Sequence, residues 1–493
     1  MCPLGPLARS MRDSITKLVS ISFFGGLIGR GLRYGFNVVI ARGLGFEALG
    51  VFAFGMVVMK GGGVFARLGL DSAAKKFIPI YRTDDDPAKV SGTVLICLVA
   101  PLLAGTAVAS ALYLGYDVIE ALVGTTFHPT TRLFILSIPL IAVMMVGVNA
   151  TYGLKQTKYS VYIRDFGQSI VALVLMATTA FVFSDLDLLI IGYLASIVFG
   201  IFLAVVFLLR EGALRFDIRP DFEYKKIFVF SLPLTLAASI QYLVSWTDIL
   251  VLGVFVPSDA VGLYQAAYQT SVLLVIVLQS ANSIFPSLAA DLHESGQNEQ
   301  LARVYSAVTR WVTYLTVLGL AFVLVYASEL LSIFGPTVPQ AQTALMILAL
   351  GQTINAAVGP TGFLLIMTGY ERLQLVNNVV AAILNLGLNL VLIQLYGIIG
   401  AAVATAISLS ILNTLRLVEV WYLLNLQPYS WKYRKGAMAI AVTFPVLLLN
   451  QLLPLPSLLQ VFVGGLAALI VFTVITWQLG FDDVDKALVE KIR

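Results

Sequence analysis

The chain has 493 residues, of which 59% are hydrophobic and 12% charged, and its formal net charge is +4. Soluble domains carry roughly 25% charged residues, so a water-soluble surface is excluded over most of the molecule and we expect a membrane protein. The weak positive charge is spread over many short segments, which argues against a nucleic-acid partner, and two distant cysteines with only two histidines predict no metal site, no cofactor and no catalytic triad.

Apolar segments long enough to cross a bilayer, about 20 residues each, occur about fourteen times along the chain. In chain order they are 18–41, 47–69, 91–114, 133–154, 163–183, 187–209, 228–256, 261–289, 306–333, 341–368, 374–395, 398–424, 437–453 and 458–479. The residues before the first segment lack the compact apolar region and cleavage site of a signal peptide, so we expect the first helix to be retained. The fold class is therefore an all-α polytopic membrane protein, with no room for a soluble domain between the spans.

Lysine and arginine are distributed unevenly between the two sets of loops. If the N-terminus is cytoplasmic, 24 of the 31 basic residues fall in the termini and the cytoplasmic loops, with Arg164 counted in the loop after the fourth helix. The opposite loops hold only Arg42 and Arg132. Because cytoplasmic loops collect basic residues, we expect both termini in the cytoplasm and the protein in the plasma (inner) membrane.

One short turn occurs twice in the chain. "GFEALGVFAF" at 45–54 and "PSDAVGLYQA" at 257–266 share acidic, glycine and aromatic positions 212 residues apart, which pair Glu47 with Asp259, Gly50 with Gly262 and Phe52 with Tyr264. An even number of helices separates the copies, so the two halves have the same orientation and are parallel repeats. The predicted organisation is a cytoplasmic N-terminus 1–17, an N-lobe 18–209 of six helices, a cytoplasmic linker 210–227, a C-lobe 228–424 of six helices, and 425–493 with two further helices and a cytoplasmic C-terminus.

Three segments carry a resemblance to a known family. "VVIARGLGFEALGVFAFGM", "SWTDILVLGVFVPSDAVGLYQAAYQ" and "NLGLNLVLIQLYGIIGAAVATAIS" resemble the polysaccharide (O-antigen-type) flippases of the multidrug/oligosaccharidyl-lipid/polysaccharide exporter superfamily. The resemblance implies two pseudo-symmetric lobes and transport of a lipid-pyrophosphate-linked oligosaccharide from the cytoplasmic to the outer leaflet, for assembly of cell-surface polysaccharide or glycoprotein glycans. It further implies contact with membrane lipid and with the glycan polymerase or glycosyltransferases of the same pathway.

Basic side chains inside predicted spans are the first candidates for a site. A charge at the bilayer centre costs at least about 2.5–3.5 kcal/mol on insertion scales, so it usually faces a cavity or a partner. Arg30 and Arg33 lie in the first predicted helix, and a guanidinium fork suits phosphate oxygens. Lys60, followed by three glycines in the second helix, could add a third positive charge to the same cavity. For all three, pairing with an acidic side chain is the alternative.

Asp248 is the one clear carboxylate well inside a predicted span. It could pair with Arg33 across the cleft, or it could bind a coupling proton or sodium ion. Near the cytoplasmic end of another span, Arg416 and Glu419 stand at i and i+3, which predicts an ion pair within one helix. Asn385 and Asn389 share a helix face, where amides usually hold helices together and could otherwise bind sugar.

The sequence leaves three rival functions open. A multidrug or cation antiporter of the same superfamily would favour an acidic cavity, whereas the predicted spans contain more basic than acidic side chains. A lipid II-type flippase is a closer alternative. A membrane enzyme such as a glycan polymerase or ligase would need a large outer loop with catalytic groups, and the longest outer loop is "GYDVIEALVGTTFHPTTR" at 115–132. We therefore expect a transporter with no catalytic residues.

Overall fold

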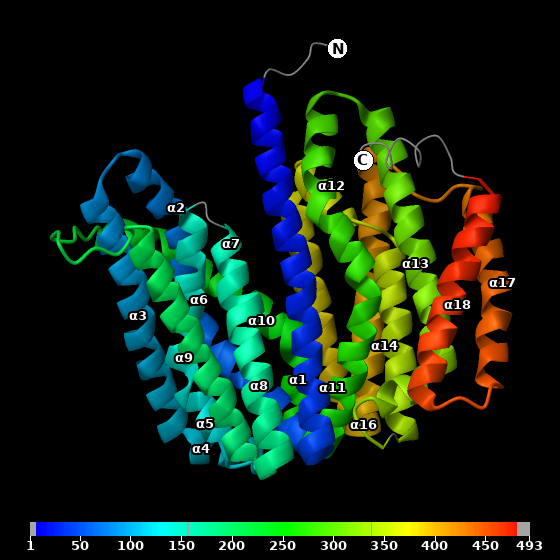
Figure 1. The fold of residues 1–493 in the computed structure, drawn as a ribbon, viewed down its shortest axis with the longest axis horizontal. Helices are drawn as coiled ribbons and strands as arrows, with labels where there is room; N and C mark the ends of the chain where they lie inside the picture. The colour runs from blue at the N-terminus through cyan, green and yellow to red at the C-terminus, as the bar shows by residue number, and fades with distance from the viewer. Residues whose placement is uncertain (1–5, 155–156, 337, 481–493) are drawn as a thin grey trace. The chain divides into compact units, whose positions relative to one another are not determined.

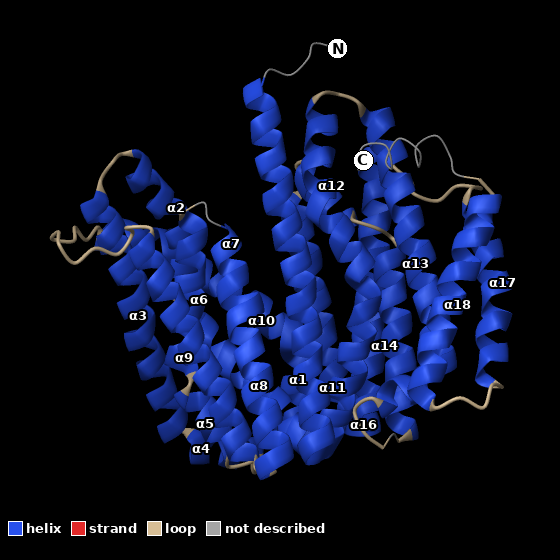
Figure 2. Ribbon diagram, viewed as in Figure 1, coloured by secondary structure: helices blue, strands red, loops and turns tan. Residues whose placement is uncertain are grey.

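The computed structural model describes residues 6–154, 157–336 and 338–480, and within these ranges it is helical with no strand (Figures 1 and 2). Lys155, Lys486, Lys491 and Arg493, which the basic-residue count placed in the cytoplasm, lie outside the described residues, as does Cys2. The chain divides into two compact units, Met1–Gly262 and Leu263–Arg493, and each is considered by itself. The predicted lobe boundaries stay a prediction.

The first unit begins with a helix that bends once and then continues. In α1 (Pro6–Ala66), Gly45 adopts φ 87° and ψ 176°, a conformation that residues with a side chain rarely adopt. Therefore α1 consists of two helical segments joined by a bend at Gly45. The rest of the unit consists of α2 (Leu70–Thr83), α3 (Pro87–Leu114), α4 (Tyr116–Val123), α5 (Thr131–Leu136), α6 (Ile138–Gly153), α7 (Thr157–Ser160), the π-helix η1 (Val161–Gln168), α8 (Ser169–Thr178), the π-helix η2 (Thr179–Phe183), α9 (Leu186–Arg210) and α10 (Tyr224–Phe255).

The second unit also contains a long helix that bends at a glycine. After α11 (Ser258–Val272), whose first turn belongs to the first unit, come η3 (Leu273–Val275), α12 (Ile276–Glu294), α13 (Asn298–Ser332), α14 (Pro339–Ala357), α15 (Thr361–Met367), α16 (Glu371–Leu424), α17 (Tyr433–Gln451) and α18 (Ser457–Gln478). Gly397, with φ 57° and ψ −131°, divides α16 into two segments. In Figure 1, α17 and α18 form a pair that packs on α13.

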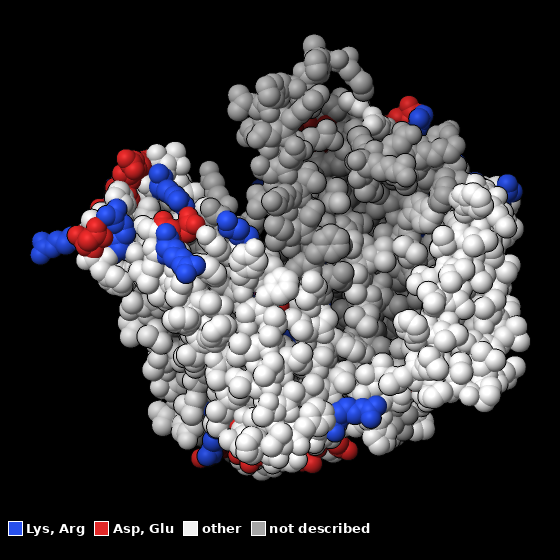
Figure 3. Space-filling view, viewed as in Figure 1, with Lys and Arg blue, Asp and Glu red and all other residues white. Residues whose placement is uncertain are grey.

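Ten helical segments among the described residues are long and apolar enough to cross a bilayer. Two of them, Ile28–Ala66 and Glu371–Leu424, contain the glycine bends and are two crossings each. With the shorter α6 and α17, these segments correspond to the fourteen predicted spans. In the first unit, Figure 3 shows charged side chains gathered at the two ends of the helices, with an apolar band between them. The prediction of an all-α, multi-pass membrane protein is confirmed.

The two copies of the repeated turn pack directly on each other inside the first unit. A Cβ built on Gly50 would lie 1.7 Å from the carbonyl oxygen of Ser258, and one built on Gly262 would lie 1.9 Å from the carbonyl oxygen of Phe46. Glycine at both positions therefore lets the two backbones touch, as small residues do where membrane helices cross closely. The repeat in the sequence thus marks a helix crossing in which each copy supplies the glycine that the other requires.

Candidate functional site

A cluster of charged side chains lies inside the first unit, where α1 meets the π-helix η1. The side chain of Asp165 is 3% exposed, and its Oδ1 accepts from Arg33 Nη1 at 3.2 Å and from Arg164 Nε at 3.3 Å. Gly29 makes the approach possible, because a Cβ there would lie 2.8 Å from Asp165 Oδ1. One buried carboxylate therefore holds two guanidiniums, on a π-helical segment of the kind often found at functional sites.

Both arginines keep access to solvent or ligand while their carboxylate is buried. The side chains of Arg33 and Arg164 are 38% and 40% exposed. On the inner side, Asn37 Nδ2 donates to the carbonyl oxygen of Arg33 at 2.8 Å, and Asn37 is itself buried. Arg30 is half-buried and stands three residues before Arg33, so the two side chains share one face of α1. Asp165 thus holds one edge of the Arg33 and Arg164 guanidinium groups, while both arginine side chains remain partly exposed.

Lys60 belongs to the same cluster, although it lies beyond the bend in α1. It is half-buried, and the positive charges of Arg33 and Arg164 act on it through space. We call Arg30, Arg33, Lys60 and Arg164, together with Asp165, the cation cluster. It contains four basic groups and one acidic group. Of the three basic side chains that the sequence selected, Arg33 and Lys60 are connected by their charge interactions, and Arg30 is included because of its position on the same face of α1.

The predicted pairing of Arg33 with Asp248 is replaced by the ion pair with Asp165. Asp248 lies in α10, two residues after the bend at Trp246, is 7% exposed and accepts from the backbone N–H of Ile249 at 2.9 Å. Its helix packs on α1, where the hydroxyl of Tyr242 donates to the carbonyl oxygen of Val57 at 2.9 Å. A role for Asp248 in binding a coupling ion or cargo stays a prediction.

Arg164 and Asp165 are the members of the cation cluster that the sequence interpretation missed. The segment "YIRDFGQ" at 162–168 was divided between a polar loop and the start of a span, so Arg164 was counted among the loop residues. The structure places it inside η1, facing the same carboxylate as Arg33. The signal in the sequence was the adjacent Arg164–Asp165 pair at the start of an apolar segment. A charged residue in a solvent-exposed loop would need no such acidic partner.

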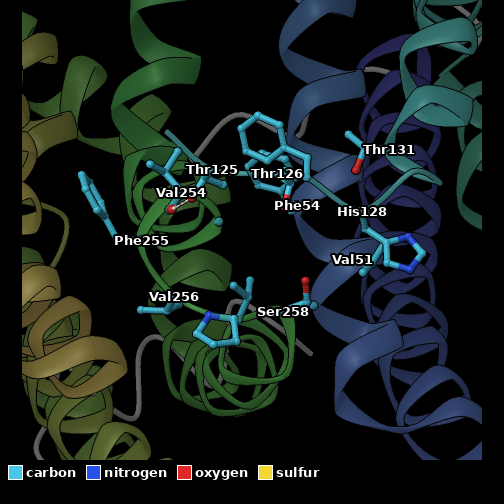
Figure 4. Close-up of a pocket in the computed structure, with 15 residues that line it drawn as sticks. Val51, Phe54, Thr125, Thr126, His128, Thr131, Val254, Phe255, Val256 and Ser258 are labelled. Atoms are coloured by element: carbon cyan, nitrogen blue, oxygen red, sulfur yellow. Dashed lines mark hydrogen bonds between the residues drawn. The ribbon is translucent and has the colours of Figure 1, made fainter. Parts of the chain in front are cut away.

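A cavity of about 290 Å³ in the first unit lies beside the repeated turns (Figure 4). Its lining includes Val51, Phe54, Ser258 and the backbone of residues 253–256, and Thr125 donates to the carbonyl oxygen of Val254 at 2.9 Å. Apart from His128, the residues described around it have no ionisable side chain. It therefore offers backbone dipoles and hydroxyls, and the cation cluster remains the stronger candidate for a charged ligand.

The two asparagines that the sequence selected in the second unit bond to each other. Asn389 Nδ2 donates to Asn385 Oδ1 at 2.9 Å along one face of α16, and Asn389 is fully buried. The predicted ion pair between Arg416 and Glu419 is not made, since Arg416 bonds to amide oxygens and Glu419 accepts from Asn377. A contribution of Asn385 and Asn389 to cargo binding stays a prediction.

Comparison with known proteins places the chain in a family. The sequence model described as "Polysaccharide biosynthesis protein" matches residues 15–290, which is more than half of the chain. The chain belongs to the polysaccharide biosynthesis protein family. A second model, described as MatE, matches residues 233–391 of this family member. The resemblance that the sequence carried is thereby confirmed at the level of the family.

Two curated proteins of Haloferax volcanii are similar to parts of this polysaccharide biosynthesis protein. The "Probable low-salt glycan biosynthesis flippase Agl15" is 28% identical over 271 residues, 52% of this chain and 55% of that protein. The "Probable flippase AglR" is 27% identical over 173 residues, 34% of this chain and 36% of that protein. The chain therefore spans about half the length, or less, of these two relatives.

Solved structures share the fold over most of the chain. The lipid II flippase MurJ, in an inward closed conformation, superposes with a TM-score of 0.69 at 16% identity and covers 94% of this chain and 99% of its own. An inward-facing multidrug resistance MATE family transporter of the MOP superfamily gives a TM-score of 0.66 at 14% identity, covering 84% and 94%. The polysaccharide biosynthesis protein thus has the polytopic fold of this superfamily.

Proposed function

We propose that this protein is a flippase that carries a lipid-pyrophosphate-linked oligosaccharide from the cytoplasmic to the outer leaflet of the plasma membrane. The observation that carries the proposal is the cation cluster, in which Arg33 and Arg164 share the buried carboxylate of Asp165 and both arginines act on Lys60 through space, within the membrane-spanning part of the first unit. Two guanidiniums on one carboxylate, with the Lys60 ammonium acting on them, leave net positive charge at this depth, which favours an anionic cargo. The glycan flippases among the relatives support the same class of cargo.

The geometry suggests how an anion would be held. Arg33 donates to Asp165 through Nη1, whereas Arg164 donates through Nε to Oδ1 and through Nη2 to Oδ2. The two arginine side chains are 38% and 40% exposed, so their remaining N–H groups can donate to a ligand. A pyrophosphate brings several oxygens and more than one negative charge, so it could accept from both forks while Asp165 keeps them in position. Lys60 and Arg30 would add positive charge. Binding and conformational change suffice, and no covalent step is needed.

The orientation and partners follow from the sequence and stay part of the proposal. The basic-residue bias places both termini in the cytoplasm, so cargo would enter from the side that carries the α2–α3 and α9–α10 connections. Membrane lipid would surround the helices, and glycosyltransferases or a polymerase of the same pathway would supply or consume the glycan. Asp248 is the candidate for coupling transport to a proton or sodium ion.

The test follows a lipid-linked oligosaccharide in reconstituted vesicles with a membrane-impermeant glycan-modifying reagent that reports its leaflet. We expect protein-dependent movement, and we expect Arg30→Ala/Arg33→Ala to abolish it. Arg215→Ala is the matched control, because its ion pair with Asp217 is exposed and lies outside the spans. Movement that persists in the double variant would discard the cation cluster as the cargo site. No movement of any lipid-linked glycan with wild-type protein would discard the flippase.

A cation antiporter is the second candidate, because the MatE model matches residues 233–391 and two carboxylates, Asp165 and Asp248, are buried in the first unit. The same vesicles loaded to report export of a cationic dye separate the two functions. Dye export without glycan movement would favour the antiporter. Movement of lipid II alone, among the lipid-linked substrates tried, would favour the lipid II-type flippase.

A further inference from the structure

A polar cavity in the second unit contains an arginine that is held entirely by neutral groups. The cavity measures about 160 Å³ and lies between α12, the α14–α15 connection and both segments of α16. In Arg416, Nε donates to Gln374 Oε1 at 3.1 Å, Nη1 to Asn413 Oδ1 at 3.3 Å and Nη2 to Asn378 Oδ1 at 2.7 Å. Three amide oxygens thus orient the guanidinium without neutralising its charge.

The nearest carboxylate is engaged elsewhere. Glu419, one turn along α16 from Arg416, accepts from Asn377 Nδ2 at 2.5 Å, and within the described ranges no carboxylate oxygen lies within 4.0 Å of Arg416. A guanidinium has five N–H donors, and three of these bonds are accounted for. Arg416 therefore retains both charge and donors for an acceptor that enters the cavity.

Two further groups in the cavity wall have hydrogen-bonding capacity left over. The hydroxyl of Thr361, in a side chain that is 1% exposed, and Asn282 Oδ1 are both buried without a hydrogen-bond partner. A buried polar group without a hydrogen-bond partner destabilises the fold, so its retention suggests a partner that arrives from outside the chain. Asn282 Oδ1 can only accept, which requires a donor such as a hydroxyl on that partner.

The wall is also shaped to leave room beside the guanidinium. A Cβ on Gly362 would lie 3.0 Å from Gln374 Nε2 and 3.4 Å from Arg416 Cζ, so glycine keeps α15 close to the polar row on α16 without filling the space. Phe363 adds an aromatic face to the lining. The volume equals that of about five water molecules in the liquid, which is comparable to a single sugar unit and far smaller than a whole lipid-linked glycan.

We propose that this cavity binds an acidic sugar, with its carboxylate on Arg416 and its hydroxyls on Asn282 and Thr361. The Arg416 guanidinium needs a hydrogen-bond acceptor and Asn282 Oδ1 needs a hydrogen-bond donor, and a carboxylated sugar supplies both on one ring. This inference rests on the proposed flippase function for its biological meaning, because the sugar would be part of the transported glycan. The binding itself is a separate property of the second unit and can be measured without transport.

The test is equilibrium binding of D-glucuronate, D-glucose and inorganic phosphate to the purified full-length protein in detergent, by calorimetry or ligand-observed NMR. We expect glucuronate to bind more tightly than both others. In Arg416→Gln, loss of charge-assisted hydrogen bonds should weaken glucuronate about ten- to a hundredfold, to the level of glucose. Arg416→Lys keeps the charge without the fork and should give an intermediate affinity.

A second variant guards against a folding defect at Arg416. Asn282→Ala lies on α12, makes none of the Arg416 hydrogen bonds, and should weaken glucuronate and glucose alike. The proposal is overturned if glucose binds as tightly as glucuronate, if Asn282→Ala leaves glucuronate binding unchanged, or if folded Arg416→Gln does so. Phosphate binding as tight as that of glucuronate would overturn the sugar and assign the cavity to a phosphate, from solution or from a lipid headgroup.

The outcome is separable from that of the flippase assay. Arg30→Ala/Arg33→Ala changes only the first unit and should retain full glucuronate binding while it loses transport. Glucuronate binding by a protein that moves no lipid-linked glycan would leave the cavity assigned and the flippase discarded. Transport of a lipid-linked glycan without glucuronate binding would support the flippase and discard the sugar site in the cavity.

Discussion

The glycine crossing at the repeated turn predicts a specific intolerance at Gly50. In Gly50→Ala, the new methyl carbon would lie 1.7 Å from the carbonyl oxygen of Ser258 and 2.9 Å from the backbone nitrogen of Gly262. Both are backbone atoms, so no side-chain rotation relieves the overlap. The start of α11 must move away from α1 until the methyl–oxygen distance reaches at least 3.0 Å, a separation below which real Cβ contacts are essentially never seen.

The size of the effect follows from two opposing contributions. Overpacking of a tight contact costs about 1–3 kcal/mol, and a backbone-to-backbone overlap belongs at the upper end. Alanine is favoured over glycine inside a helix by about 0.8–1 kcal/mol, which offsets part of that cost. We expect a net destabilisation of about 1–2 kcal/mol. With an unfolding entropy of about 2.1 cal/mol/K per residue, this corresponds to a fall of roughly 1–4 °C in the unfolding midpoint.

The assay is thermal unfolding of the purified protein in detergent, followed by intrinsic tryptophan fluorescence and size-exclusion chromatography. Gly31→Ala is the matched control, because it replaces a glycine in the same helix where a Cβ meets nothing within 4 Å. That variant should unfold at the wild-type temperature or slightly above. If Gly50→Ala unfolds no lower than Gly31→Ala, the close crossing of the two repeated turns is refuted.

Three other substitutions have defined outcomes. Asp165→Asn removes the acid that competes with a bound anion, so inorganic pyrophosphate should bind about tenfold more tightly by calorimetry, and weaker binding would contradict its role as an internal counter-ion. The Tyr81 hydroxyl and Lys226 hold the pKa of Glu223 below its usual value, so this carboxylate stabilises the fold above about pH 4.3 and stops doing so as the pH falls through the lowered pKa; Glu223→Gln should therefore unfold earlier than wild type at pH 7 and together with it near pH 3. Gly436→Ala should lower the free energy of unfolding by about 1–3 kcal/mol, because its methyl would lie 2.1 Å from the Tyr314 ring, whereas Gly465→Ala, with a 3.4 Å contact, should not lower it.

Most of the fold could be predicted because hydropathy and loop charge report directly on spans. The positions of the fourteen crossings follow from apolar length, which the bilayer fixes. What the sequence could not show is continuity across the bends: residues 18–69 were predicted as two helices, and the structure continues one into the next through Gly45 in a non-helical conformation. A single glycine can end a helix or bend it, and local composition does not distinguish these outcomes.

Only part of the candidate site could be predicted from the sequence: the basic side chains inside apolar segments, but not the acidic partner of Arg33. Arg30, Arg33 and Lys60 stood out because a charge in an apolar segment has no inexpensive alternative to a cavity or a partner. The partner of Arg33 could not be chosen from sequence, since Asp165 and Asp248 both lie in or beside apolar segments and the selection depends on how helices far apart in the chain pack. The contact between Gly29 and Asp165 decides it, and nothing local to either residue announces that contact.

Asp165 explains how the positive charge of the cation cluster is tolerated within the membrane-spanning part of the first unit. Without Asp165, Arg33 and Arg164 would face each other and Lys60 at short range in a medium of low dielectric, where like charges repel strongly. With Asp165 present, the positive charge of the cluster is partly neutralised, but one carboxylate cannot neutralise two guanidiniums and an ammonium. A cargo with a single negative charge would gain little over Asp165, whereas a pyrophosphate could engage the remaining donors of both arginines at once. Selectivity for multiply charged headgroups would therefore follow from the imbalance that Asp165 leaves, and Asp165→Asn should extend binding to singly charged phosphates that the wild-type protein rejects.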